Sequence, residues 1–187
     1  MEYAVELPED IQDQMEALSE QGEEAMDQGR FEEALDLYNQ ALSILPEPRE
    51  NWEAYVWLKA AMGDACFLID RFDDGLDHFY EAYTAAGPAN VNPFIVYRLG
   101  QIYRQLQDEE NAVEFLLRAY MLEGEGIFED EEDLIFLRNR VELDDSDEDG
   151  EDGYDYDDDE DSIRRFDDEG FSRGYIPRDD YEEYGDD

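Results

Sequence analysis

Residues 96–119 read VYRLGQIYRQLQDEENAVEFLLRA, and this stretch decides the fold. Within it, Gly100 is followed by Ala112 and then by Ala119, at gaps of 12 and 7 residues. Apolar residues recur around these positions at helical spacing, which predicts two helices separated by a short polar turn. The small residues have a physical purpose. They allow two antiparallel helices to cross closely, whereas larger side chains would hold the backbones apart.

The same cadence occurs twice earlier in the chain. The earlier sets, with the same gaps, are Gly22, Ala34 and Ala41, and then Gly63, Gly75 and Ala82. The leading glycines are 41 and then 37 residues apart, close to the 34-residue unit of the tetratricopeptide repeat (TPR). Over about residues 8–126 the chain therefore resembles the TPR family. The surplus residues fall in the loops around 47–51 and 87–92, where they are either packing adjustments or contact loops.

This resemblance implies an all-α fold. The expected architecture is a right-handed superhelix of three TPR helix pairs plus a C-terminal capping helix, followed by a disordered acidic tail. The TPR domain is expected over 1–141, with repeats at about 15–48, 56–89 and 93–126 and the capping helix at about 130–141, and the tail over 142–187. Apolar spacing and Pro/Gly punctuation predict the seven helices over about 8–28, 31–44, 50–69, 72–85, 93–106, 109–122 and 130–141.

The composition is strongly acidic. The chain has 56 acidic and 13 basic residues, a formal charge of −43, and Lys59 is its only lysine. Such a charge argues against nucleic acid as a direct ligand, because phosphate contacts need Lys or Arg. It also repels anionic membranes and favours basic protein partners. The start of the chain lacks a secretory pattern and no segment predicts a membrane span, so we expect a cytoplasmic protein.

The acidic tail has two readings. It lacks apolar periodicity and is too charged to bury a core, which predicts disorder. Asp145, Asp147 and Asp149 match the first half of a calcium loop, but Tyr156 stands where the loop's last acidic ligand is expected. These three aspartates are a weak metal candidate, and a weakly calcium-responsive protein is one alternative function. We expect no other metal and no cofactor.

No catalytic group stands out. Cys66 and His78 are the only residues of their kinds. Cys66 occupies a slot that faces the partner helix, and no basic neighbourhood lowers its pKa. A zinc site would need several Cys or His ligands. We therefore predict no catalytic residues and no enzyme activity.

The TPR resemblance also predicts a partner-binding groove, since in this family the first helix of each pair lines the concave face. The positions that the repeat phase places there are Glu20, Glu23, Asp27, Trp57, Asp64, Phe67, Phe94, Tyr97, Arg98, Gln101 and Arg104. The family's known peptide receptors clamp a terminal carboxylate with Lys, Arg and Asn. Here Ser19 and Glu23 stand at matching positions, and Glu23 would repel a carboxylate. An aromatic centre with acidic flanks suits a basic, partly apolar segment instead.

A narrower resemblance concerns the end of the repeats. The run 92–101, NPFIVYRLGQ, together with 119–124, AYMLEG, and 127–130, IFED, is similar to small bacterial TPR proteins found near polymorphic or secreted toxins. It implies a non-catalytic protein–protein interaction module for a basic partner, such as an immunity protein that neutralises a nuclease-like toxin. The alternative is a general adaptor or chaperone for a basic client protein. The sequence does not indicate an oligomeric state.

Overall fold

The computed structural model describes residues 7–87 and 91–143, and the part up to Glu142 forms one compact unit. The helices in this part are α1 (Glu9–Asp27), α2 (Phe31–Ile44), η1 (Arg49–Asn51), α3 (Glu53–Leu68), α4 (Phe72–Ala86), α5 (Pro93–Gln105), α6 (Glu109–Glu123), η3 (Gly124–Ile127) and α7 (Glu131–Arg138). No strand occurs among the described residues. The seven predicted helices are thus confirmed, with two short 3₁₀ turns added. No helix in the described ranges is both long and apolar enough to cross a membrane.

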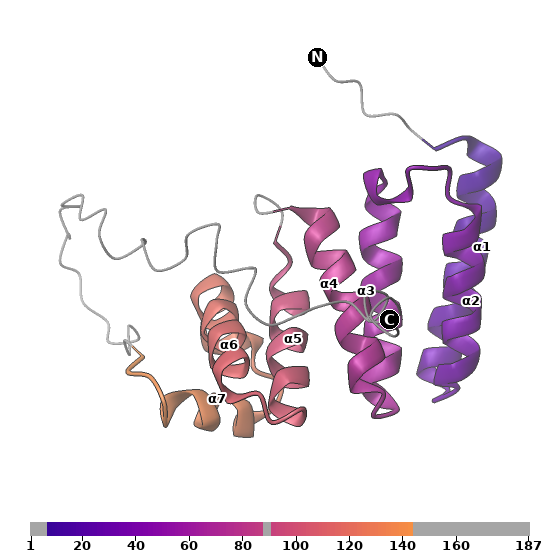
Figure 1. Ribbon diagram of the computed structural model, residues 1–187. Helices are drawn as coiled ribbons and strands as arrows, with labels where there is room; N and C mark the ends of the chain where they lie inside the picture. The colour runs from indigo at the N-terminus through magenta and orange to yellow at the C-terminus, as the bar shows by residue number, and fades with distance from the viewer. Residues whose placement is uncertain (1–6, 88–90, 144–187) are drawn as a thin grey trace, which may run out of the picture. The chain divides into compact units, whose positions relative to one another are not determined.

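Consecutive helices pack as pairs, α1 with α2, α3 with α4, and α5 with α6 (Figure 1). Each pair meets where the repeat phase puts a glycine opposite the bulky residue 16 positions later. A Cβ atom on Gly63 would lie 2.7 Å from the Phe79 ring. One on Gly100 would lie 2.8 Å from the Leu116 side chain, and Gly22 faces Tyr38 in the same way. The glycines therefore permit the close crossing that the sequence predicts.

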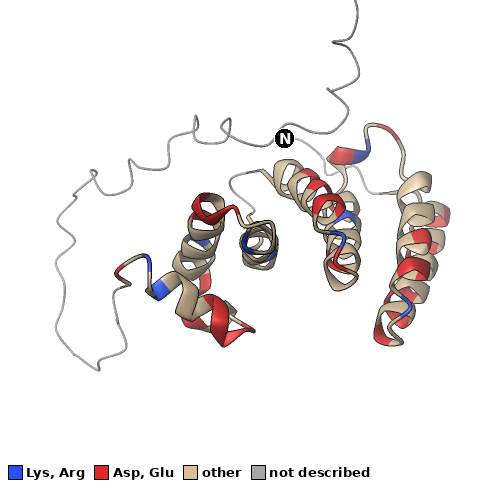
Figure 2. Cartoon of the chain, turned by 60° about the horizontal axis from the view of Figure 1, so that its bottom comes forward, with Lys and Arg blue, Asp and Glu red and all other residues tan. Residues whose placement is uncertain are grey.

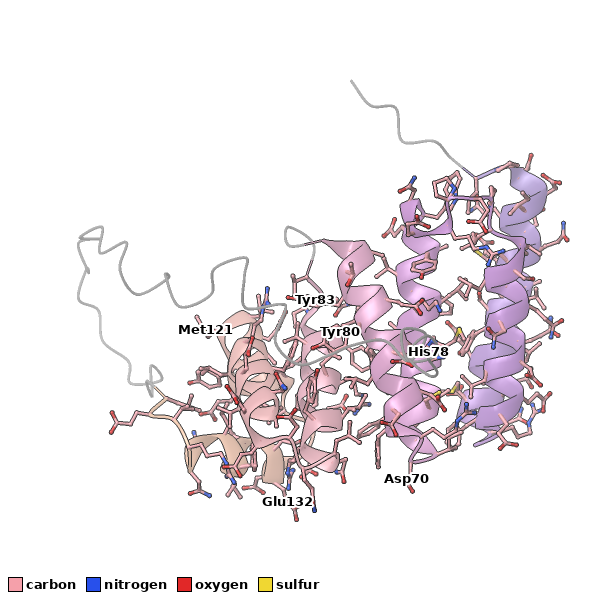
Figure 3. The ribbon with its side chains drawn as sticks, in the orientation of Figure 1. Asp70, His78, Tyr80, Tyr83, Met121 and Glu132 are labelled. Atoms are coloured by element: carbon pink, nitrogen blue, oxygen red, sulfur yellow. The ribbon has the colours of Figure 1, made fainter. Side chains whose placement is uncertain are left out.

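The turns inside the three pairs share one geometry. Asp70 and Gln107 have positive φ angles of 59° and 61°, and Gly29 occupies the same repeat position with φ 70°. In the second turn, the backbone N–H of Arg71 donates to the carbonyl oxygen of Cys66 at 2.9 Å, which satisfies one of the open carbonyls at the end of α3. Figure 3 marks Asp70 at this turn. Glycine adopts the left-handed backbone conformation at the lowest cost. The second and third turns have Asp70 and Gln107 at this position, so their backbone conformation there is less favourable.

The third helix begins later than predicted. The sequence suggests a helix from residue 50, whereas α3 begins at Glu53 after the short turn η1. Trp52 separates the two elements with extended backbone angles, φ −99° and ψ 134°. Its indole Nε1 donates to the carbonyl oxygen of Pro46 at 2.8 Å and ties the connection down. The surplus residues of this loop therefore form the short turn η1 and a side-chain contact just before α3.

The capping helix α7 is joined to α5 through a buried carboxylate. Asp133, which is 2% exposed, accepts hydrogen bonds from the Tyr97 hydroxyl and the Gln101 amide, both at 2.8 Å. Its other oxygen pairs with Arg104. The backbone N–H of Asp130 also donates to the Tyr97 hydroxyl at 3.2 Å. This network covers the part of α5 that the repeat phase predicts to be open to a partner.

Candidate partner-binding groove

A groove of about 930 Å³ lies between the first helices of the three pairs. It is lined by Glu23, Met26 and Asp27 of α1; Tyr38 of α2; Glu50 and Asn51 of η1; Trp52; Glu53, Val56, Trp57, Ala60, Ala61 and Asp64 of α3; Ala85 and Ala86 of α4; Asn92; and Phe94 and Ile95 of α5. The lining combines small and aromatic side chains with carboxylates from α1, η1 and α3. Trp57 is 41% exposed, so a large apolar ring faces the solvent there.

Five of the eleven sequence-predicted groove residues line this hollow. They are Glu23, Asp27, Trp57, Asp64 and Phe94. Glu20 is exposed on α1 but lies outside the lining. Phe67, Tyr97, Arg98, Gln101 and Arg104 are also outside it. The groove therefore contains predicted acidic and aromatic residues from the first two repeats, but only Phe94 from the third.

Six predicted residues lie outside the lining, and the five other than Glu20 contact other parts of the fold. Tyr97 and Gln101 are 1% and 7% exposed, and together with Arg104 they hold Asp133 of the cap. Asp133 stands within a run of five consecutive acids, 129–133, which the sequence alone presents as a solvated stretch. Nothing in that run marks the one carboxylate that turns inward.

Arg98 joins the second and third repeats. Its guanidinium carbon lies 4.9 Å from the centre of the Phe67 ring and 5.1 Å from that of Phe94. Its Nε is 2.8 Å from an Asp64 carboxylate oxygen, and its Nη1 donates to the Gln101 amide oxygen at 2.7 Å. Burial raises the pKa of Asp64, although the charge of Arg98 opposes this rise. The arginine is thus enclosed by two rings and a carboxylate at one end of the groove.

Sequence reasoning missed several lining residues. The most consequential are Glu50 and Glu53, which add two carboxylates, and Trp52, which forms part of the wall. The sequence did contain a signal for this region. A contact role was one of the two interpretations of the surplus residues in the inter-repeat loops. Tyr38 packs opposite Gly22. It also reaches the groove, because its ring meets the Trp57 ring edge-on at 5.7 Å between centres.

Most Lys and Arg side chains of the repeats are paired with carboxylates of the same chain, and none of them lines the groove. Nine Lys and Arg residues precede position 142. Eight of them form ion pairs within the described part of the chain: Arg30, Arg49, Lys59, Arg71, Arg98, Arg104, Arg138 and Arg140. The ninth, Arg118, lies over the Tyr83 ring at 5.3 Å. On the helices, acidic positions are more frequent than basic ones (Figure 2), and the groove lining includes five carboxylates and no Lys or Arg.

Cys66 and His78 both lie in the described part of the chain. Cys66 is 1% exposed, and burial raises the pKa of its thiol to about 11, which disfavours the reactive thiolate. His78 lies on α4 (Figure 3), where burial and the charge of Lys59 lower its pKa to about 4. The described residues contain no group of three His, Cys, Asp or Glu side chains that could hold a metal ion. Asp145, Asp147 and Asp149 lie outside the described residues.

Comparison with known proteins identifies the repeats. Tetratricopeptide-repeat family models match residues 15–48 and 95–125, and α3 and α4 form a further helix pair between these matches. No curated protein matches the sequence.

The solved structures with a similar fold include the following two. The first TPR domain of Spaghetti (RPAP3), solved with the HSP90 peptide SRMEEVD, is 21% identical with a TM-score of 0.52, covering 68% of this chain and 90% of its own. The N-terminal domain of stress-induced protein-1 from C. elegans is 18% identical with a TM-score of 0.51, covering 69% of this chain and 95% of its own. At these identities the likeness concerns the fold. The chain carries tetratricopeptide repeats and has the helical-repeat fold of TPR domains.

Proposed function

We propose that this protein is a non-catalytic protein–protein interaction module whose groove binds a basic, partly apolar segment of a partner protein. The observation that carries the proposal is the groove lining. It combines Trp57, 41% exposed, with five carboxylates and no Lys or Arg. An exposed aromatic ring supplies an anchor for an apolar side chain, and the carboxylates favour positive charge. Of the five carboxylates, Asp64 is paired with Arg98.

The net charge supports the same partner chemistry. A formal charge of −43 attracts a basic protein before contact, and such steering raises association rates at low salt. The ion pairs within the repeats already occupy eight of the nine cations before position 142. Acidic partners therefore meet net repulsion in this part of the chain, whereas basic partners meet attraction.

The peptide in the Spaghetti complex is a useful contrast. Its sequence, SRMEEVD, contains three acids and one arginine. In the groove described here, a peptide of that kind would lie against Glu23, Asp27 and Asp64. Charge repulsion disfavours that pairing, so we expect no measurable binding of SRMEEVD at physiological salt.

Two partner classes have the required character. The first is a nuclease-like toxin, whose nucleic-acid cleft is basic, in which case this protein acts as its immunity protein. The second is a basic client protein for which it acts as an adaptor or chaperone. We favour the first class because a strongly acidic protein is the electrostatic complement of a nucleic-acid-binding cleft.

A selection for peptide ligands tests the proposal without assuming a partner. The full-length protein is immobilised and presented with a phage-displayed library of random twelve-residue peptides at physiological salt. We expect enrichment of peptides that combine Arg or Lys with an aromatic or aliphatic residue. Enrichment of acidic peptides would contradict the proposed partner chemistry.

A matched pair of variants locates the binding. Trp57→Ala should weaken an enriched peptide by roughly 30-fold, which corresponds to about 2 kcal/mol for a hot-spot ring. Met121→Ala removes another large exposed side chain, 66% exposed on α6 outside the groove lining (Figure 3), and should leave the affinity unchanged. Circular dichroism must show that both variants stay folded. Equal affinity of the two variants would place the binding site elsewhere.

A further inference from the structure

One corner of the groove gathers carboxylates around two aromatic rings. Glu23 and Asp27 project from α1, and Asp64 from α3. All three carboxylates line the groove together with Tyr38. Burial first, and then the negative charges of Glu23, Asp64 and Asp27, raise the pKa of the Tyr38 hydroxyl to about 12. The Trp57 ring packs edge-on against Tyr38. No Lys or Arg in the described part of the chain pairs with Glu23 or Asp27.

The adjoining end of the groove shows what such surroundings accommodate. There Arg98 lies between the rings of Phe67 and Phe94 and meets the carboxylate of Asp64. A planar guanidinium can stack on an aromatic face while its edge pairs with a carboxylate. The corner around Trp57 has the same two kinds of group, an aromatic ring and carboxylates. No arginine of the described residues lines it.

We infer that this corner is a subsite for an arginine side chain of the partner, with the guanidinium stacked on Trp57 and paired with Glu23 and Asp27. The inference rests on the proposed function, since it names the residue that the basic segment places in the groove. Asp64 is already paired with Arg98, so the two exposed α1 carboxylates supply the charge.

Lysine fits the corner less well. Its ammonium is a compact, strongly hydrated point charge, and it has no plane that stacks on an indole. Arginine can use the ring and the two carboxylates at once, because its fork donates along the edge while its face remains free. The subsite is therefore expected to discriminate between two residues of equal charge.

Matched peptides test this discrimination. Fluorescein-labelled hexa-arginine and hexa-lysine are titrated with the full-length protein at about 150 mM salt, and binding is followed by fluorescence anisotropy. We expect hexa-arginine to bind at least about fivefold more tightly. In Trp57→Leu, and in the double variant Glu23→Gln/Asp27→Asn, the ratio of the two affinities should fall close to one.

A control variant removes the same charge outside the groove. Glu32→Gln/Asp36→Asn neutralises two exposed acids of α2 that do not line the groove, and it should keep the fivefold ratio. If the groove variants weaken both peptides equally and the wild-type ratio is near one, the arginine subsite is wrong while the basic-segment proposal stands. If the groove variants alter neither affinity, the peptides bind elsewhere, and both the subsite and the groove proposal fail. A fivefold ratio that persists in the groove variants also overturns the subsite.

Discussion

Replacing Gly100 by alanine tests the packing principle of the repeats. A Cβ atom at this position would lie 2.8 Å from Cγ and Cδ2 of Leu116 and 3.0 Å from the Leu116 backbone nitrogen. Leu116 is fully buried, and its backbone belongs to α6. The side chain cannot relieve the contact alone, so α5 and α6 must move apart to admit one methyl group.

Two opposing effects determine how much Gly100→Ala changes the free energy of unfolding. Overpacking a buried site costs about 1–3 kcal/mol, and the backbone contact places Gly100 in the upper half of that range. Alanine is a better helix former than glycine by about 1 kcal/mol, which offsets part of the cost. We expect a net loss of about 1–2 kcal/mol in the free energy of unfolding. For a domain of this size, that loss lowers the melting temperature by about 4–8 °C.

Gly75→Ala is the matched control within the same architecture. Its Cβ atom would meet the Gly63 carbonyl oxygen at 3.3 Å and Ile102 at 3.4 Å, which is tight but without a severe overlap. Alanine already occupies the equivalent positions 34 and 112. The gain in helix propensity should balance the small strain, so the melting temperature should stay close to that of the wild type. Thermal melts followed by circular dichroism at 222 nm measure both variants. A Gly100→Ala protein as stable as Gly75→Ala would refute the reasoning.

Three further predictions concern the domain boundary, a turn and a partly buried histidine. Truncation after Leu143 should change the melting temperature by less than about 5 °C, because the described helices bury their own core. A larger fall, which corresponds to a loss on the order of 1 kcal/mol in the free energy of unfolding, would show that residues 144–187 stabilise the repeats. Gln107→Gly should stabilise the domain by roughly 0.5–1 kcal/mol in denaturant titrations, because Gln107 has φ 61°, and a destabilised variant would contradict this. The chain's single histidine, His78, should titrate near pH 4 by NMR, since burial lowers its pKa from 6.5; a measured value near 6.5 would show that the imidazole is solvated. As pH falls from about 6.5 to 4, the unfolded chain binds a proton that the folded chain does not, so His78 contributes a loss of stability over that window, which His78→Asn should remove.

The repeat architecture could be predicted because close helix crossings restrict residue size. Only small residues fit at positions such as Gly22, Gly63 and Gly100, where bulky side chains press against the backbone. Their common phase therefore fixed the pairing of helices. Tetratricopeptide-repeat family models match residues 15–48 and 95–125.

The residues that line the groove were less predictable because several helix faces carry similar side chains. Repeat phase placed Tyr97, Gln101 and Arg104 on the first helix of the third pair, but it could not show that α7 covers them. That contact depends on Asp133, which resembles its acidic neighbours in sequence and differs from them only in burial. The loop before α3 likewise gave no sign that Trp52 would fold back on Pro46.

Two indole signals can report whether a basic segment binds in the groove. The chain has only two tryptophans, Trp52 and Trp57, and both line the groove. The Trp52 indole N–H is engaged by the Pro46 carbonyl oxygen, whereas Trp57 is 41% exposed. In a ¹⁵N-labelled full-length protein titrated with hexa-arginine, the Trp57 indole signal should shift in a saturable manner and the Trp52 signal should shift less. If the peptide binds while neither indole signal moves, the groove is not the binding site.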